Sequence, residues 1–138
     1  MSMDNILKTV LIIEDNPAQA LALESLLIAE GLQVLWAPDG KTGVLKAQQL
    51  VPDVIVLSIE TPDIDGFETC RRLKENVRTG GIPVVMLSVH DDAVTVTHGI
   101  DLGAVDFIPK DAFSGTVLLE TLRQLQILPS TACVIEAL

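Results

Sequence analysis

The sequence has few basic residues. Nine lysines and arginines stand against 19 aspartates and glutamates, which gives a formal net charge of −10 at pH 7. A surface that binds the phosphate backbone of nucleic acid needs the opposite sign, so we expect no nucleic-acid binding by this chain. Arg71, Arg72, Lys74 and Arg78 lie close together, but a run of charges on a helix is usually a face in contact with water.

Cysteines and long apolar runs are also scarce. Cys70 and Cys133 are the only cysteines. Their spacing matches neither a metal site nor a redox pair, and Cys70 is expected to be a small core residue. The N-terminus has no basic segment followed by an apolar stretch, and no apolar run reaches the length that spans a membrane. We expect a cytoplasmic protein with no membrane association.

The apolar residues that are present fall into five short runs, each followed by a helical pattern. Hydrophobic residues make up 49% of the chain, enough for one compact domain over residues 1–125 with a short tail over 126–138. Strands are predicted over residues 9–13, 33–36, 54–57, 83–87 and 104–108. In the helices after the third and fifth strands, Val77 is expected to face inward and Ser114 to form the N-cap. Four consecutive β-branched residues over 94–97 make the fourth helix the weakest.

This alternation predicts an α/β fold, a doubly wound (βα)5 sheet of five parallel strands. In the strand order 2-1-3-4-5, the carboxyl ends of the strands gather at one crevice. They carry the acidic pair Glu14 and Asp15, then Ser58, Ser88 and Lys110. Two carboxylates suit a hard cation such as Mg²⁺, whereas a lysine and a hydroxyl suit a phosphoryl group.

The segments LIIEDN, PDVIVL with TPDIDGFE, VVMLS and DFIPK occur in that order. With them the chain resembles the receiver domain of bacterial response regulators, a CheY-like, flavodoxin-like fold, from about Lys8 to Leu125. The resemblance implies two-component phosphorelay signalling and no enzyme activity of the domain's own. It implies Mg²⁺ on Glu14, Asp15 and the backbone carbonyl of Glu60. It also implies phosphoryl contacts from Ser88 and Lys110, and a change of rotamer at the aromatic Phe107 on activation.

The phosphoacceptor position departs from the family. The phosphoacceptor is an aspartate four residues before the loop proline, and counting back from Pro62 gives Ser58. A serine hydroxyl is a weak nucleophile unless a base takes its proton. The site also loses one negative charge, so Mg²⁺ is expected to bind less tightly. As an alternative to Mg²⁺ binding, Lys110 is expected to pair directly with Asp15 or Glu14. The family usually has a proline after this lysine, whereas here Asp111 follows Lys110. The peptide bond from Lys110 to Asp111 is therefore expected to be trans.

We therefore expect a degenerate receiver that acts as a phosphorylation-independent interaction module. Its partners would be a histidine kinase or a downstream signalling protein, bound through the fourth helix, fifth strand and fifth helix. A homodimer through the same face is also expected. One alternative is a receiver phosphorylated on Ser58 or another group. A second is a flavodoxin-like small-ligand binder, disfavoured because no glycine-rich phosphate loop follows the first strand.

Overall fold

The structure, a computed structural model, describes residues 7–129 and alternates strand and helix throughout. The predicted alternation is confirmed, with element ends shifted by one or two residues. The elements are β1 (Thr9–Ile13), α1 (Pro17–Ala29), β2 (Gln33–Ala37), α2 (Gly40–Leu50), β3 (Val54–Ser58), α3 (Gly66–Glu75), β4 (Val84–Ser88), α4 (Ala93–Asp101), β5 (Asp106–Pro109) and α5 (Ser114–Gln124).

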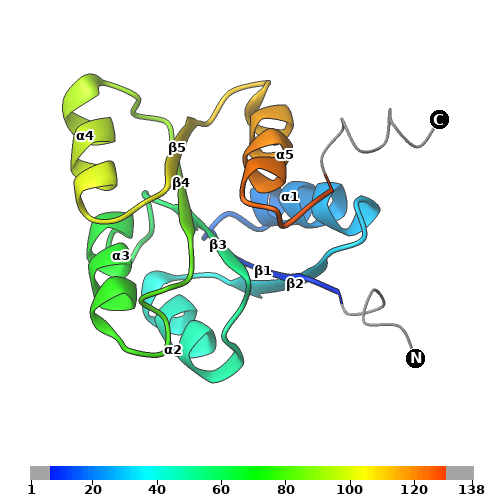
Figure 1. The fold of residues 1–138 in the computed structure, drawn as a ribbon. Coiled ribbons are helices and arrows are strands. Elements are labelled where there is room, and N and C mark those ends of the chain that lie inside the picture. Colours follow the sequence, from blue (N-terminus) through cyan, green and yellow to red (C-terminus); the bar gives the residue numbers. More distant parts are fainter. Residues whose placement is uncertain (1–6, 130–138) are drawn as a thin grey trace.

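The five strands form one parallel sheet in the order β2-β1-β3-β4-β5, which confirms the predicted fold. The strand order reverses between β1 and β3, which are neighbours in the centre of the sheet (Figure 1). In register, Ser58 at the end of β3 lies beside Leu87, and Ser88 at the end of β4 lies beside Pro109. Adjacent strands thus end almost level, so their last side chains share one edge of the sheet.

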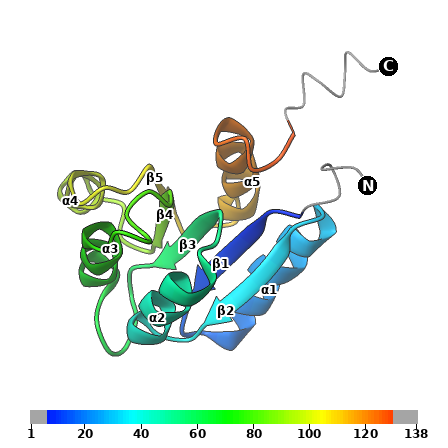
Figure 2. The same ribbon diagram turned by 60° about the horizontal axis from the view of Figure 1, so that its bottom comes forward.

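Helices cover both faces of this sheet. Alternate strand residues point to opposite faces, and the core is divided accordingly into two apolar clusters. One cluster, with Leu57 and Met86, packs against α2 and α3 and includes Leu102 after α4; the other, with Val56 and Leu87, packs against α1 and α5. The same division of helices is visible in Figure 2. β3 and β4 are buried along their whole length, as expected for continuous apolar runs in a parallel sheet.

Four of the helices have an N-cap residue whose side chain accepts hydrogen bonds from the first turn. The carboxylate or amide oxygens of Asn16, Asp39, Asp65 and Asp92 accept hydrogen bonds from backbone N–H groups of the first turn of α1, α2, α3 and α4. The prediction that Ser114 caps α5 is wrong. Ser114 is the first residue of α5, and its hydroxyl instead donates to the backbone carbonyl of Asp111, 3.1 Å away.

The prediction that Val77 faces inward is also wrong. α3 ends at Glu75, and Val77 is 99% exposed. Asn76 takes an extended conformation, and the buried hydroxyl of Thr79 donates to the carbonyl of Leu73 in the last turn, 2.6 Å away. This bond satisfies a carbonyl that one more turn of helix would have used, so the helix stops before Val77.

Part of the predicted tail belongs to the core. Ile127 and Leu128 pack against the cluster between the sheet and helices α1 and α5. The remainder of the tail, residues 130–138 with Cys133, lies outside the described residues. Over residues 7–129, no helix combines the length and the hydropathy that crossing a membrane requires.

Candidate functional site

The ends of three strands meet at the ammonium group of Lys110, which directly follows β5. Lys110 Nζ donates to the Ser58 hydroxyl oxygen at 2.6 Å and to Glu14 Oε1 at 2.9 Å. These residues are separated by 52 and 96 positions in sequence, yet the parallel register delivers them to one point. The predicted convergence of Glu14, Ser58 and Lys110 is therefore present, and Lys110 pairs with Glu14 as one of the two alternatives proposed.

Glu14 is a buried carboxylate whose oxygens both have donors. Its side chain is 2% exposed, and that of Lys110 is 16% exposed. The second carboxylate oxygen accepts from the backbone N–H of Asn16 at 3.1 Å. The backbone carbonyl of Glu14 accepts from the indole N–H of Trp36 at 2.8 Å. Burial of a charge is costly unless it is paired and hydrogen-bonded, and here both conditions are met.

Ser88 joins this group through the side chain of Glu60. The Ser88 hydroxyl donates to Glu60 Oε2 at 2.6 Å, and Lys110 Nζ lies 3.9 Å from Glu60 Oε1. From the sequence, only the backbone carbonyl of Glu60 was expected to take part. Its position in the sequence, two residues after Ser58, was the one feature that could have indicated a role for its carboxylate.

Asp15 and Phe107, the remaining predicted residues, take no part in these hydrogen bonds. Asp15 is exposed to solvent. Phe107 is partly buried and packs against the cluster that contains Met86, on the sheet face covered by α2, α3 and α4. The Phe107 ring fits there because Gly99 of α4 has no side chain: a Cβ at Gly99 would stand 3.1 Å from the ring. The structure thus places Phe107 as a core residue, and its role as a switch stays a prediction.

The loop after Ser58 is fixed at several points. The N–H of Ile59 donates to the Leu87 carbonyl at 3.0 Å, and the carbonyl of Ile59 accepts from Gly66 at 2.8 Å. The carboxylate of Asp63 accepts from the backbone N–H groups of Gly40 and Lys41, at 3.0 and 2.9 Å. Desolvation raises the pKa of Asp63, but the backbone hydrogen bonds, led by those from Lys41 and Gly40, together outweigh it and lower this pKa from 3.8 to about 2. The loop between β3 and α3 is therefore hydrogen-bonded to the start of α2.

Among residues 7–129, no three His, Cys, Asp or Glu side chains are placed to share a metal ion. A cation at Glu14 would compete with the Lys110 ammonium and the Asn16 N–H for the carboxylate oxygens. The peptide bond from Lys110 to Asp111 is trans, as expected.

A cavity of about 370 Å³ adjoins Lys110 between α1 and α5. Its apolar walls come from Leu23 and Leu26 of α1 and from Leu87 and Val89. Its polar lining is formed by Glu14, Gln19, Lys110, Asp111 and Ser114. Of the residues that meet at the strand ends, Glu14 and Lys110 therefore line this recess.

Comparison with known families gives a direct match. The family model described as the response regulator receiver domain matches residues 10–123. This chain belongs to that family. As a receiver domain, it takes part in two-component signalling, and domains of this family are generally non-enzymatic modules that interact with proteins such as histidine kinases and effectors.

Individual relatives agree with this assignment. Protein PilH of Pseudomonas aeruginosa is 34% identical over 109 residues, which are 79% of this chain and 90% of PilH. The transcriptional regulatory protein AfsQ1 of Streptomyces coelicolor is 37% identical over 115 residues, covering 83% of this chain. The matched residues are only 49% of AfsQ1, so this chain spans about half the length of that relative.

Solved structures show the same fold. The chemotaxis protein CheY4 of Vibrio cholerae superposes with a TM-score of 0.80 at 26% identity, covering 86% of this chain and 98% of CheY4. A putative response regulator from Chloroflexus aurantiacus gives a TM-score of 0.81 at 27% identity, covering 86% of this chain and 97% of that one.

Proposed function

We propose that this receiver domain is a phosphorylation-independent protein-interaction module, in which Ser58 replaces the phosphoacceptor aspartate. The observation that carries the proposal is the contact of 2.6 Å between Lys110 Nζ and Ser58 Oγ. An ammonium group only donates hydrogen bonds. It occupies a lone pair of the hydroxyl oxygen and offers no site for the hydroxyl proton.

A serine attacks phosphorus only if a base removes its proton. The buried carboxylate of Glu14 is engaged by Lys110 and by the N–H of Asn16. Ser58 itself is buried, which also counts against the alternative that a separate kinase phosphorylates it. The groups around Ser58 thus favour a hydroxyl that stays unmodified.

Weak Mg²⁺ binding at Glu14 and Asp15 is part of the same proposal. Lys110 already neutralises Glu14, and Asp15 is exposed to solvent. A divalent cation would meet less net negative charge than in a site with an additional aspartate, and its affinity falls accordingly.

The partner surface that we propose is formed by α4, β5 and α5. Apolar side chains are exposed along it, with Val94 of α4 80% exposed and Phe113, just before α5, 71% exposed. Ile100, Val105 and Val117 add to this exposed apolar area. Exposed apolar side chains grouped on one face are typical of interaction sites. The proposed partners are a histidine kinase, a downstream signalling protein or a second copy of the chain.

The test is intact-mass spectrometry after incubation with acetyl phosphate and Mg²⁺, on the wild type and on Ser58→Asp. We expect no mass gain in the wild type and one phosphoryl group on the variant. In parallel, NMR shifts of Ser88 and Phe107 should respond to beryllofluoride only in the variant. A phosphoryl group on the wild-type protein would overturn the proposal.

A further inference from the structure

We propose that the carboxylate of Glu60 is an internal ligand that fills the phosphoryl-contact position at Ser88 and Lys110, the position that the family resemblance assigns to a phosphoryl group. Three donors surround this carboxylate. The Ser88 hydroxyl donates to Oε2 at 2.6 Å, while Oε1 lies 3.5 Å from the N–H nitrogen of Val89 and 3.9 Å from Lys110 Nζ. A hydroxyl, a backbone N–H and an ammonium group that converge in this way suit an anion with several oxygens.

The hydroxyl of Ser88 is oriented for this contact. Its oxygen accepts from the backbone N–H of His90 at 2.9 Å while its hydrogen points to Glu60. The chain of bonds from His90 through Ser88 to Glu60 is polarised by the charge at its end, and such bonds strengthen one another. The first residues of the loop after β4 are thereby tied to the loop after β3.

The neutrality of Ser58 explains why a carboxylate can occupy this position, and here the inference rests on the proposed function. Glu14 and Lys110 together carry no net charge, and Ser58 adds none. Glu60 then brings the single negative charge that the donors at Ser88 and Val89 favour. An aspartate at position 58 would add a second negative charge next to Lys110, and this charge would repel the carboxylate of Glu60.

The consequence reaches α4. Gly99 is the only buried residue of this helix, so α4 depends strongly on the loop that leads into it. When Glu60 binds Ser88 and Val89, that loop is held without any modification of the protein. A constant position of α4 is what a phosphorylation-independent partner surface requires.

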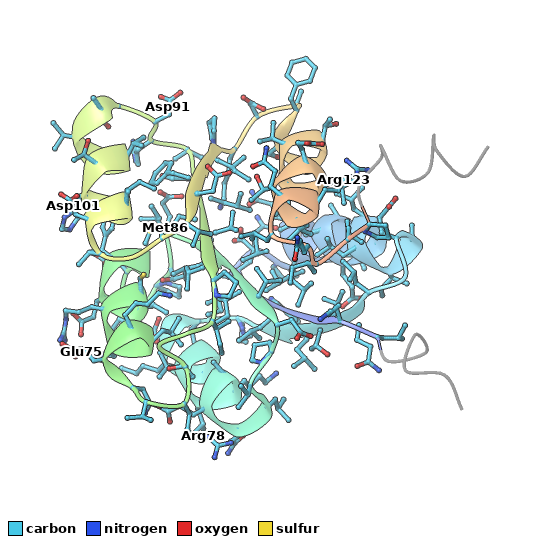
Figure 3. All side chains as sticks on the ribbon, viewed as in Figure 1. Glu75, Arg78, Met86, Asp91, Asp101 and Arg123 are labelled. Atoms are coloured by element: carbon cyan, nitrogen blue, oxygen red, sulfur yellow. The ribbon has the colours of Figure 1, made fainter. Side chains whose placement is uncertain are left out.

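The experiment compares Glu60→Ala with the matched control Glu75→Ala. Glu75 lies on α3 (Figure 3). Its side chain is 62% exposed and pairs with Arg71. It lies in the last turn of that helix, and a helix that follows a parallel strand runs back to the opposite edge of the sheet. The two variants therefore lose the same charge, but only one loses it near Ser88.

Amide hydrogen exchange at Val89 and His90 is measured by NMR on the full chain, with and without sodium sulfate as the probe. In Glu60→Ala we expect exchange at least about tenfold faster, a difference well outside measurement error. Sulfate should slow it again and shift both resonances. The wild type and Glu75→Ala should not respond to sulfate, and Glu60→Gln should respond as Glu60→Ala does.

The inference is overturned if Glu60→Ala matches Glu75→Ala in exchange and in its response to sulfate. Because Glu60 is 36% exposed, its removal is expected to leave the fold intact, and far-ultraviolet circular dichroism checks this. Phosphorylation of the wild type would defeat the proposed function while leaving these exchange rates as they are, so the two failures are distinguishable.

Discussion

Replacement of Lys110 by methionine tests the electrostatic balance of the site most directly. The substitution keeps most of the length of the side chain and removes its charge. Glu14, 2% exposed, then keeps only the N–H of Asn16 as a partner for its carboxylate. Breaking a buried ion pair from one side costs about 3–5 kcal/mol.

We expect a loss near the lower end of that range, about 3 kcal/mol, because the Lys110 side chain is 16% exposed and part of its charge reaches water. A domain of this kind has a total stability of about 5–15 kcal/mol. The loss would therefore move the midpoint of urea unfolding by a large fraction of its value.

The assay is urea unfolding followed by tryptophan fluorescence and circular dichroism. Trp36 is the only tryptophan, and its indole N–H binds the carbonyl of Glu14, so it reports from the site itself. The double variant Glu14→Gln/Lys110→Met should recover to within about 1 kcal/mol of the wild type, because no unpaired charge is left buried. Lys41→Met, at an exposed position, should change stability by less than about 0.5 kcal/mol.

Two results would refute this reasoning. The first is a free energy of unfolding of Lys110→Met that is lower than that of the wild type by less than about 1 kcal/mol, which is what an ordinary surface ion pair contributes. The second is a double variant as unstable as Lys110→Met alone, since the cost would then come from lost packing and not from the charge of Glu14.

Three further predictions concern the loops and helices around the site. A Cβ at Gly66 would stand 2.5 Å from the Ile59 Cα and 3.0 Å from the Ser58 carbonyl oxygen, so Gly66→Ala should cost about 1–3 kcal/mol in chemical unfolding; Gly81→Ala, with open space around it, should be neutral or slightly stabilising, and equal effects would contradict the argument. Asp63 has its pKa lowered from 3.8 to about 2, so its carboxylate stabilises the fold above pH 3.8 and loses that contribution as the pH falls through about 2. Asp63→Asn should therefore lower the unfolding midpoint at pH 7 and differ less from the wild type near pH 2; a constant difference would count against the hydrogen bonds to Gly40 and Lys41. Amides of α4 should exchange faster than those of the other four helices, because the helix buries only Gly99 and has β-branched residues over 94–97; slower exchange than in α5 would refute this.

The strands and the edge where they end were predictable from the sequence. Continuous apolar runs such as 54–57 are typical of buried parallel strands, and parallel order brings their carboxyl ends together. Two neighbouring residues were candidates for each of two helix caps, Asp15 or Asn16 before α1 and Asp91 or Asp92 before α4, and the structure has Asn16 and Asp92 there.

What the sequence did not reveal depends on contacts between distant segments. Glu60 was expected to contribute only its backbone carbonyl. The contact of its carboxylate could not be predicted, because the side chain is partly exposed and its direction is set by Ser88, 28 residues away. Val77 continued the apolar pattern of its helix, but the hydroxyl of Thr79 ended that helix first. Ser114 is a favourable N-cap residue by type, yet the turn at Asp111 takes its hydroxyl.

The contact between α4 and the sheet has a mechanical consequence. At Gly99 the helix meets the sulfur of Met86 and the ring of Phe107, with no side chain of its own between them. A thioether is flexible and adapts to altered neighbours, so the Met86 side chain can refill the space beneath Gly99 while the loop before α4 holds the helix in place. Substituting Met86 with a branched residue would remove that freedom and turn an adjustable support into a fixed one.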